Sequence, residues 1–257
     1  MNDTANERKV LFSVQGLIKK FPNGHEGAAG IDLEIYEGES LLIAGSNGSG
    51  KTLLMRMFSG LTEPSAGKIL YKGKPLSEWG NLLRGSIGLV FQDADAQLIG
   101  ETVEEDMRFG PVNLKLEKSL IDTRVNNVME KLGLKEKKAY PPRRLSGGEK
   151  RRLAIAGILA MGCETVIMDE PFANLDWPGI IQVLKIIQEL KKQSNTLIIL
   201  THELEKVLAF ADRLVILDRG RIRDSGKPEE VLNRLEPEWG VRDPRHSYQS
   251  ASDCTWL

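Results

Sequence analysis

The stretch Gly45-Ser46-Asn47-Gly48-Ser49-Gly50-Lys51-Thr52 decides the fold of this chain. Apolar residues 40–44 come directly before it and predict a buried strand, while residues 53–59, closed by Gly60, predict a helix. In that context glycines let the backbone turn its N–H groups toward phosphate oxygens, and the N-terminus of the helix favours an anion. We therefore expect the whole stretch to bind a nucleotide, with Lys51 at the β- and γ-phosphates and the Thr52 hydroxyl as a Mg²⁺ ligand. A glycine-rich connecting turn is the alternative, but it gives no reason for Lys51 and Thr52.

Strands and helices alternate along the rest of the chain. Predicted strands lie at residues 10–14, 31–35, 40–44, 68–71, 87–91, 165–168, 196–200 and 214–217, and predicted helices at 53–59, 119–132, 178–192 and 228–235. Buried apolar strands separated by helices predict an α/β fold with a mainly parallel sheet covered on both faces. Residues 94–161 are more helical and more charged, which indicates a helical insertion.

Composition excludes several classes of protein. The 35 basic residues nearly cancel the 36 acidic ones, so the charge balance predicts no nucleic-acid partner. The longest strongly apolar run, residues 153–161, is shorter than the roughly 18 residues that a spanning helix needs. The polar residues 1–9 contain no apolar stretch like that of a secretory signal. Cys163 and Cys254 lie far apart and have no metal-ligand spacing, which favours a reducing, cytosolic location.

Two neighbouring carboxylates follow the apolar strand at 165–168. Asp169 and Glu170 stand at the carboxyl end of this strand, where the first carboxylate can hold Mg²⁺ and the second can polarise an attacking water. An Asp-Glu pair in that place is also common in a solvated turn. The phosphate-binding stretch favours the functional interpretation.

The segment Leu145-Ser146-Gly147-Gly148-Glu149 has the pattern of a capping box and therefore predicts the start of a helix. A capped helix explains Ser146 and Glu149, but it leaves Gly147 and Gly148 unexplained, because glycine weakens a helix. Their exposed N–H groups would suit a phosphate.

Further polar residues follow predicted strands or precede a predicted helix, and alone they are weak indications of function. His202 follows the strand at 196–200, with Thr201 as the predicted N-cap of a helix, and Gln92 follows the strand at 87–91. A lone histidine at the start of a helix is usually structural or solvated. Asp176, just before the helix at 178–192, is predicted to be the N-cap of that helix.

Taken together, these motifs resemble those of the nucleotide-binding subunits of ABC transporters, in the same order and over residues 10–235. Residues 45–52 are similar to Walker A, 166–170 to Walker B, and 145–149 to the ABC signature. Gln92 falls at the family's Q-loop position, Asp176 at the D-loop position, and His202 at the position of the switch histidine. Phe21 occupies the place of an aromatic that stacks on adenine. Phe21 replaces the commoner tyrosine, and Phe172 and Asn174 also depart from the pattern, which affects details of the interface.

The resemblance implies ATP and Mg²⁺ as cofactors, with Thr52, Gln92 and Asp169 around the metal. It also implies an N-terminal antiparallel β region, a helical subdomain at about 94–161, and a head-to-tail dimer with ATP at the interface. Ser146, Gly147 and Gly148 would contact the γ-phosphate bound to the other subunit, which would account for the two glycines. Glu170 and His202 would be the catalytic residues. Residues 1–9 and 236–257 are then a polar extension and a tail.

A narrower resemblance, carried by residues 91–99, 102–111 and 145–161, is to the energy-coupling-factor subfamily, which includes cobalt and nickel importers. It implies a transmembrane coupling protein, a membrane component that captures a metal ion or a vitamin, and a peripheral position on the cytoplasmic face of the cell membrane. Leu98, Ile99 and Phe109 suit a groove for coupling helices, or equally the core of the helical insertion. A soluble ABC ATPase with a non-transport partner and an ATP-binding regulatory module are the alternatives. A metal ion and a vitamin are equal alternatives as cargo, and a homodimer and a heterodimer as the functional pair.

Overall fold

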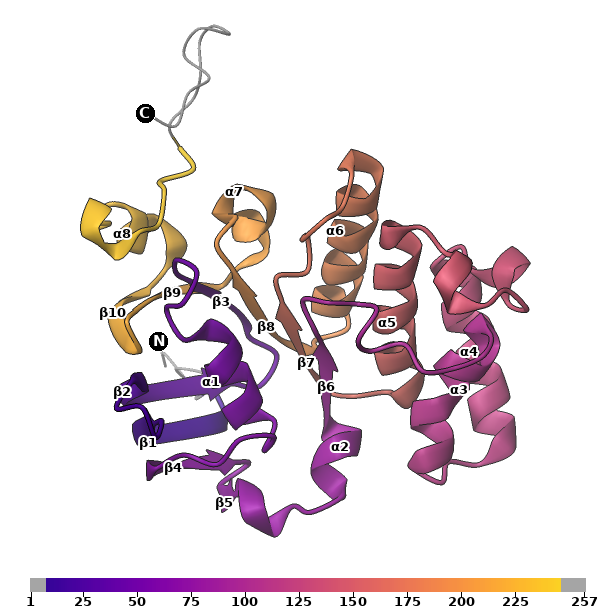
Figure 1. The fold of residues 1–257 in the computed structure, drawn as a ribbon, viewed down its shortest axis with the longest axis horizontal. Coiled ribbons are helices and arrows are strands. Elements are labelled where there is room, and N and C mark those ends of the chain that lie inside the picture. Colours follow the sequence, from indigo (N-terminus) through magenta and orange to yellow (C-terminus); the bar gives the residue numbers. More distant parts are fainter. Residues whose placement is uncertain (1–7, 246–257) are drawn as a thin grey trace, which may run out of the picture.

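The computed structural model describes residues 8–245, which form two β-sheets with helices packed around them (Figure 1). The larger sheet has the strand order β10-β9-β3-β8-β7-β6. Its strands are β3 (Ser40–Ala44), β6 (Ile87–Val90), β7 (Thr165–Asp169), β8 (Thr196–Thr201), β9 (Arg213–Asp218) and β10 (Arg221–Gly226). Neighbouring strands pair in parallel except β9 and β10, which are antiparallel. The predicted α/β class with a mainly parallel sheet is therefore confirmed.

The smaller sheet is antiparallel and has the order β2-β1-β4-β5, as expected for the N-terminal region. It contains β1 (Val10–Lys20), β2 (Glu26–Tyr36), β4 (Ala66–Tyr71) and β5 (Lys74–Pro75). Helix α1 (Lys51–Phe58) shares one apolar core with both sheets. In that core the Phe12 ring centroid lies 5.3 Å from that of Phe58 and 4.9 Å from that of Tyr71.

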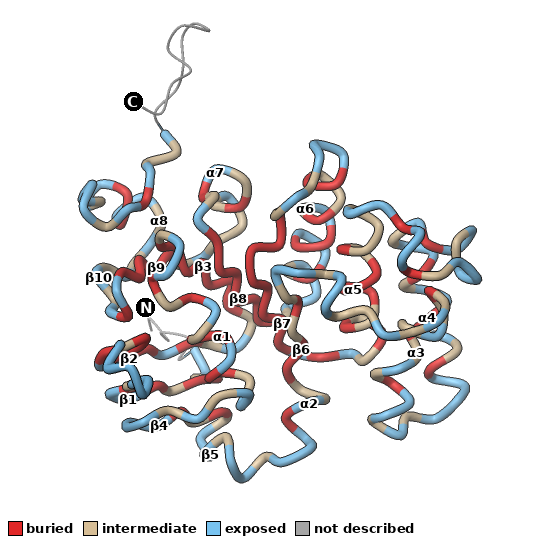
Figure 2. Tube along the Cα trace, viewed as in Figure 1, coloured by how far each residue is buried: buried red, intermediate tan, exposed pale blue. Residues whose placement is uncertain are grey.

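A second core covers the opposite face of the large sheet. It is formed with α5 (Gly147–Met161), α6 (Trp177–Lys192), α7 (Leu204–Val207) and α8 (Pro228–Leu232). With apolar layers on both faces, the central strands are buried along their whole length, as Figure 2 shows. Such strands need apolar residues at every position, which explains their continuous rather than alternating hydrophobicity.

The helical insertion has a core of its own beside β6. Helices α3 (Val103–Asn113) and α4 (Lys118–Lys131) pack with the start of α5 around Val103, Val125 and Leu153, each fully buried. The short α2 (Leu82–Ser86) leads into β6. Because α5 contributes to this core and to that of the large sheet, it links the insertion mechanically to the nucleotide-binding core.

Some features differ from the sequence prediction. The prediction that Thr201 caps a helix is wrong, because Thr201 ends β8 and α7 begins only at Leu204. Strand β10 was not predicted, since its polar residues form a strand only by pairing with β9. Within the predicted tail, Val241 is buried in the second core. The rest of the predicted extension and tail, residues 1–7 and 246–257, lies outside the described residues.

Among the helices of residues 8–245, none combines the length and the apolar character that crossing a bilayer requires.

Candidate functional site

The phosphate loop, residues 45–52, connects β3 to α1, as predicted. Gly48 and Gly50 have φ angles of 83° and 108°, which side-chain-bearing residues rarely adopt. A Cβ atom on Gly45 would lie 2.2 Å from the Leu217 carbonyl oxygen, so this position has no room for a side chain. Gly50 is the N-cap residue of α1, which therefore has no side-chain cap, and the first turn of the helix contains no acidic residue. The loop therefore offers a helix N-terminus that can receive an anion.

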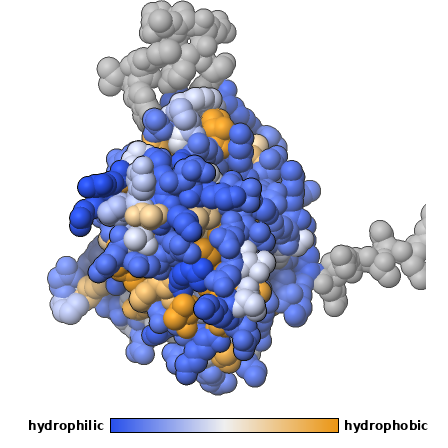
Figure 3. All heavy atoms as spheres, turned by 90° about the vertical axis from the view of Figure 1, so that its right-hand side faces the viewer, coloured by the Kyte–Doolittle hydropathy of each residue, from blue (hydrophilic) through white to orange (hydrophobic). Residues whose placement is uncertain are grey.

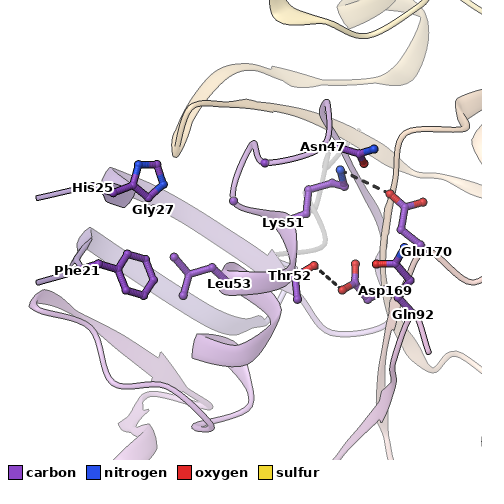
Figure 4. A pocket seen from close by; sticks show the side chains of 12 residues that line it. Phe21, His25, Gly27, Asn47, Lys51, Thr52, Leu53, Gln92, Asp169 and Glu170 are labelled. Atoms are coloured by element: carbon purple, nitrogen blue, oxygen red, sulfur yellow. Dashed lines mark hydrogen bonds and ion pairs between the residues drawn. The ribbon is translucent and has the colours of Figure 1, made fainter. Parts of the chain in front are cut away.

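A cavity of about 430 Å³ lies over the loop (Figure 4). It is lined by Phe21, His25, Gly27, Asn47, Gly48, Gly50, Lys51, Thr52, Leu53, Gln92, Asp169 and Glu170. Most of these residues were predicted to bind the nucleotide or Mg²⁺. His25, Gly27 and Leu53 were not, because nothing in their sequence context marks them as ligands. The structure thus brings together residues from the N-terminal sheet, the loop, and the ends of β6 and β7.

Lys51 curls back over the loop. Its Nζ donates hydrogen bonds to the carbonyl oxygens of Gly45 at 2.7 Å and Ser46 at 3.1 Å. The same atom lies 3.5 Å from Glu170 Oε1, and the two side chains are only 6% and 5% exposed. A buried charge is costly unless it is paired, so each of these groups compensates the other. A nucleotide phosphate can replace the carboxylate as the partner of Lys51.

Asp169 and Thr52 form the part of the cavity that fits a divalent cation. The Thr52 hydroxyl donates to Asp169 Oδ2 at 2.6 Å, whereas the buried Oδ1 has no hydrogen-bond partner among residues 8–245. Burial raises the pKa of Asp169, and the hydrogen bond from Thr52 opposes that shift. A hard cation prefers oxygen ligands, and it would satisfy the orphan oxygen and compensate the charge. The residues present therefore fit Mg²⁺.

Glu170 is held from several directions. His202 Nδ1 lies 2.9 Å from its Oε1, and the Thr201 hydroxyl donates to its Oε2 at 2.8 Å. The Glu170 backbone has a φ of 44°, in the left-handed region, and its N–H donates to the Leu200 carbonyl oxygen at 2.8 Å. Non-glycine residues in this conformation concentrate at functional sites. The contact with His202 was not foreseen in sequence, but it joins the two predicted catalytic residues.

The Gln92 backbone is fixed by a residue of α5 that sequence analysis missed. Arg151 is 2% exposed, and its guanidinium donates to the carbonyl oxygens of Phe91 and of Gln92, the latter at 2.6 Å. Burial lowers the pKa of Arg151. In sequence, an arginine among the charged residues at the start of a helix suggests a solvated face, so no signal marked it. The structure thereby connects the helix that follows Ser146 to the cavity.

The far end of the cavity carries two flat rings. The Phe21 and His25 ring centroids lie 6.1 Å apart with an interplanar angle of 16°. The Phe21 N–H donates to the His25 carbonyl oxygen at 2.9 Å, which holds the two residues together at the tip between β1 and β2. Leu53 lies between this tip and the loop in Figure 4. The arrangement can stack a nucleotide base.

The signature residues Ser146, Gly147 and Gly148 lie outside this cavity. The capping box is confirmed: the Ser146 hydroxyl accepts from the Glu149 N–H at 3.3 Å, and the Glu149 side chain accepts from the Ser146 N–H at 2.9 Å. Cβ atoms on Gly147 and Gly148 would lie 3.6 Å from the Asn174 carbonyl oxygen and 3.7 Å from the Gly179 Cα. None of the three signature residues lines the cavity described above.

Asp176 is next to these glycines and also outside the cavity lining. Its side chain accepts from the Gly179 N–H at 3.0 Å, so the predicted N-cap of α6 is confirmed. Within one chain, then, the signature residues and Asp176 form a group separate from the phosphate loop.

A phosphate loop between a buried strand and a helix, with a carboxylate pair at the end of a neighbouring parallel strand, defines a P-loop nucleotide hydrolase. A family model described as "ABC transporter" matches residues 28–173. This chain belongs to the ABC transporter family, and it is an ATPase that couples ATP hydrolysis to transport.

Within the ABC transporter family, the chain is similar to several curated relatives and solved structures. An energy-coupling factor transporter ATP-binding protein EcfA from Methanocaldococcus jannaschii is 38% identical over 229 residues, which cover 88% of this chain and 82% of the relative. EcfA2 from Clostridium perfringens is 39% identical over 230 residues, or 88% and 81% of the two chains. The structure of cbiO1 from Clostridium perfringens, described as part of the ABC transporter complex cbiONQ, superposes with a TM-score of 0.79 at 38% identity, covering 88% and 91%. A dimeric bacterial ABC transporter cassette, at 23% identity and a TM-score of 0.77, shows the same fold.

Proposed function

We propose that this chain is the ATP-hydrolysing subunit of a membrane importer of the energy-coupling-factor type, with a metal ion such as cobalt or nickel, or a vitamin, as cargo. The similarity to EcfA proteins and to cbiO1 supports the importer type. The observation that carries the proposal is the Glu170 carboxylate, buried at the edge of the cavity, 2.9 Å from His202 and 3.5 Å from Lys51. This is where a base is needed for water attacking the terminal phosphate of a bound nucleotide.

In this proposal each residue of the cavity has a separate role in binding or hydrolysing ATP. The phosphate loop and Lys51 bind the β- and γ-phosphates, and Phe21 stacks on the adenine. Glu170 takes a proton from the attacking water as the new oxygen–phosphorus bond forms, and the bond from the γ-phosphorus to the bridging oxygen of ADP breaks. His202 holds the γ-phosphate and the water in place. Mg²⁺, when bound by Thr52 and Asp169 with Gln92 nearby, neutralises phosphate charge.

A second subunit, identical or similar, completes the site in the proposal. Ser146, Gly147 and Gly148 of one subunit would contact the γ-phosphate held by the other as ATP closes the dimer. None of the three lines the cavity at the phosphate loop of its own chain, which supports a contact with a nucleotide bound by another subunit. Asp176, beside the glycines, would lie in the same interface. In a symmetric pair the interface forms both sites at once.

The proposed partners also include a transmembrane coupling protein and a substrate-capturing membrane component, which would place the chain on the cytoplasmic face of the membrane. Ile99 is 58% exposed and Phe109 is 52% exposed, so these side chains are not part of the core of the insertion, although Leu98 packs partly against it. Val112, one turn from Phe109 on α3, is 56% exposed. Figure 3 shows apolar atoms interrupting the hydrophilic surface on this side of the molecule. Exposed apolar side chains support docking of a membrane protein here.

Glu170→Gln tests the chemistry. We expect the steady-state rate of ATP hydrolysis to fall at least about 100-fold, as loss of a general base typically causes. ATP binding should persist, and an ATP-dependent dimer should accumulate on size-exclusion chromatography. Glu164→Gln is the matched control, because Glu164 directly precedes β7, as Glu170 directly follows it, and its side chain is 69% exposed. Hydrolysis by Glu170→Gln at the parental rate would refute the assignment of the base.

Co-purification tests the transport role. The tagged chain, isolated in detergent from its native host, should recover integral membrane proteins in a defined ratio. A stable complex with ribosomes or DNA, without membrane proteins, would instead favour a soluble ABC ATPase that serves a non-transport partner.

A further inference from the structure

The Thr201 hydroxyl makes a contact that neither the predicted motifs nor the proposed chemistry uses. Thr201 is fully buried, and its Oγ1 donates to Glu170 Oε2 at 2.8 Å. The same Oγ1 accepts from the Glu203 N–H at 3.0 Å. A hydroxyl has a single proton to donate, and an ionised carboxylate can only accept. The proton of Thr201 is therefore committed to Glu170, and the Glu203 N–H fixes the hydroxyl in that orientation.

The donor stands on a rigid element. Strand β8 is hydrogen-bonded on both sides, with Thr201 opposite Ala44 of β3 and Leu200 opposite Asp169 of β7. The Leu200 carbonyl oxygen accepts from the Glu170 N–H at 2.8 Å. The backbone and the carboxylate of Glu170 are thus both tied to two successive residues of β8. This double tie maintains the left-handed φ of 44° at Glu170.

Lys51 and His202 approach the other carboxylate oxygen of Glu170, Oε1. Lys51 Nζ and His202 Nδ1 both approach Oε1, at 3.5 Å and 2.9 Å. The proposed function requires both of these groups to turn toward the phosphates of a bound nucleotide. The His202 side chain is 49% exposed beyond the end of β8, which leaves it room to move. Thr201 has no such freedom, so its contact with Oε2 persists when the contacts with Oε1 are given up.

We propose that Thr201 is a positioning residue that aims the Glu170 carboxylate at the attacking water once nucleotide is bound. The proposal rests on the proposed function, because it presupposes that Glu170 is the base. With Oε2 held by Thr201, Oε1 is the oxygen left to accept the proton of the water. Without the hydroxyl, the carboxylate can rotate about its side-chain bonds, and the reactive geometry is populated less often.

The test compares Thr201→Val, Thr201→Ser and Thr196→Val. Valine has nearly the shape of threonine without the hydroxyl, and we expect it to lower kcat about 10- to 100-fold with KM for ATP within about twofold. Serine keeps the hydroxyl and should retain kcat within about threefold. Thr196→Val removes another buried hydroxyl, 4% exposed, from the other end of β8, where it accepts from the Gly38 N–H at 2.9 Å, and should leave kcat unchanged.

Each outcome decides between the two proposals. If Thr201→Val retains the parental kcat while Glu170→Gln is inactive, the positioning role is refuted and Glu170 stands as the base. If Glu170→Gln is fully active, the proposed chemistry itself fails. An equal loss of kcat in Thr201→Val and Thr196→Val would show a general structural effect and would also refute the positioning role. Should Thr201→Val not fold, Thr201→Ala against Thr201→Ser makes the same comparison.

Discussion

Replacing Gly50 by alanine probes the conformation on which nucleotide binding depends. Gly50 has a φ of 108° and is the N-cap residue directly before α1. A Cβ atom there would lie 2.6 Å from the carbonyl oxygen of Gly27, a residue of β2 that also lines the cavity. Alanine therefore brings a strained backbone conformation together with a clash against another backbone, which cannot rotate away as a side chain would.

The size of the effect follows from these distances. The contact is about 0.8 Å shorter than the 3.4 Å of an ordinary van der Waals contact, so the loop must move by roughly that amount. A displacement of about 0.8 Å lengthens an N–H···O distance from about 2.9 Å to about 3.7 Å, which is no longer a hydrogen bond. Each hydrogen bond to a charged phosphate is worth about 1.5–3 kcal/mol. Losing one weakens ATP binding by about 10- to 100-fold, at 1.4 kcal/mol for each factor of ten.

Equilibrium binding of a fluorescent ATP analogue measures this loss, and urea unfolding measures the accompanying strain. Gly133→Ala is the control, because Gly133 has a φ of 65° with nothing within 4 Å of its Cβ position and lies outside the cavity lining. It should lower the free energy of unfolding by about 1 kcal/mol and leave ATP affinity unchanged. If Gly50→Ala binds the analogue within twofold of the parent, the loop does not hold the phosphates in the way inferred.

Two further experiments test the cap of α6 and the burial of Cys163. Asp176→Ala should lower the free energy of unfolding, measured in urea, by about 1 kcal/mol, because α6 loses its cap. Asp176→Asn keeps a capping side chain and should retain the parental stability. Equal stability of the parent and both variants would contradict the cap. Burial raises the pKa of Cys163 to about 12, so at pH 8 its alkylation by iodoacetamide should be about a thousandfold slower than that of a free thiol. Peptide mapping of the Cys163 peptide, with and without urea, measures this, and rapid labelling of the folded protein would show that the residue is accessible.

The parts of the fold that sequence predicted best are those where local chemistry and tertiary role coincide. The strand at 40–44, the glycine loop and the following helix are each specified by their own residues, and the structure places β3 and α1 within a residue or two of the predicted bounds. The capping box at Ser146 and the cap at Asp176 are likewise local patterns. Such features depend on contacts between residues a few positions apart, which a sequence displays directly.

The features that sequence missed depend on contacts across long separations. In sequence, Thr201 could equally be a helix cap or a hydroxyl at the end of a strand, and only its hydrogen bond to Glu170, which follows β7, distinguishes the two. Arg151 has charged neighbours in sequence, so its burial is not predicted locally. It depends on the carbonyl oxygens of Phe91 and Gln92, which follow β6 and accept its hydrogen bonds. His25 joins the cavity because the turn between β1 and β2 folds it beside Phe21. A pattern of neighbouring residues in the sequence does not predict any of these contacts.

In the proposed dimer, Arg151 would connect the two halves of the composite site. It sits on α5, the helix that Ser146 opens, and it holds the backbone of Gln92 at the edge of the cavity in the same chain. In the proposed dimer, a nucleotide bound by one subunit draws on Ser146 of the other. A shift of α5 on that contact would be transmitted through Arg151 to Gln92, and so to the Mg²⁺ site of the second nucleotide. The buried guanidinium makes this connection stiff, because releasing it would leave a charge without partners inside the protein.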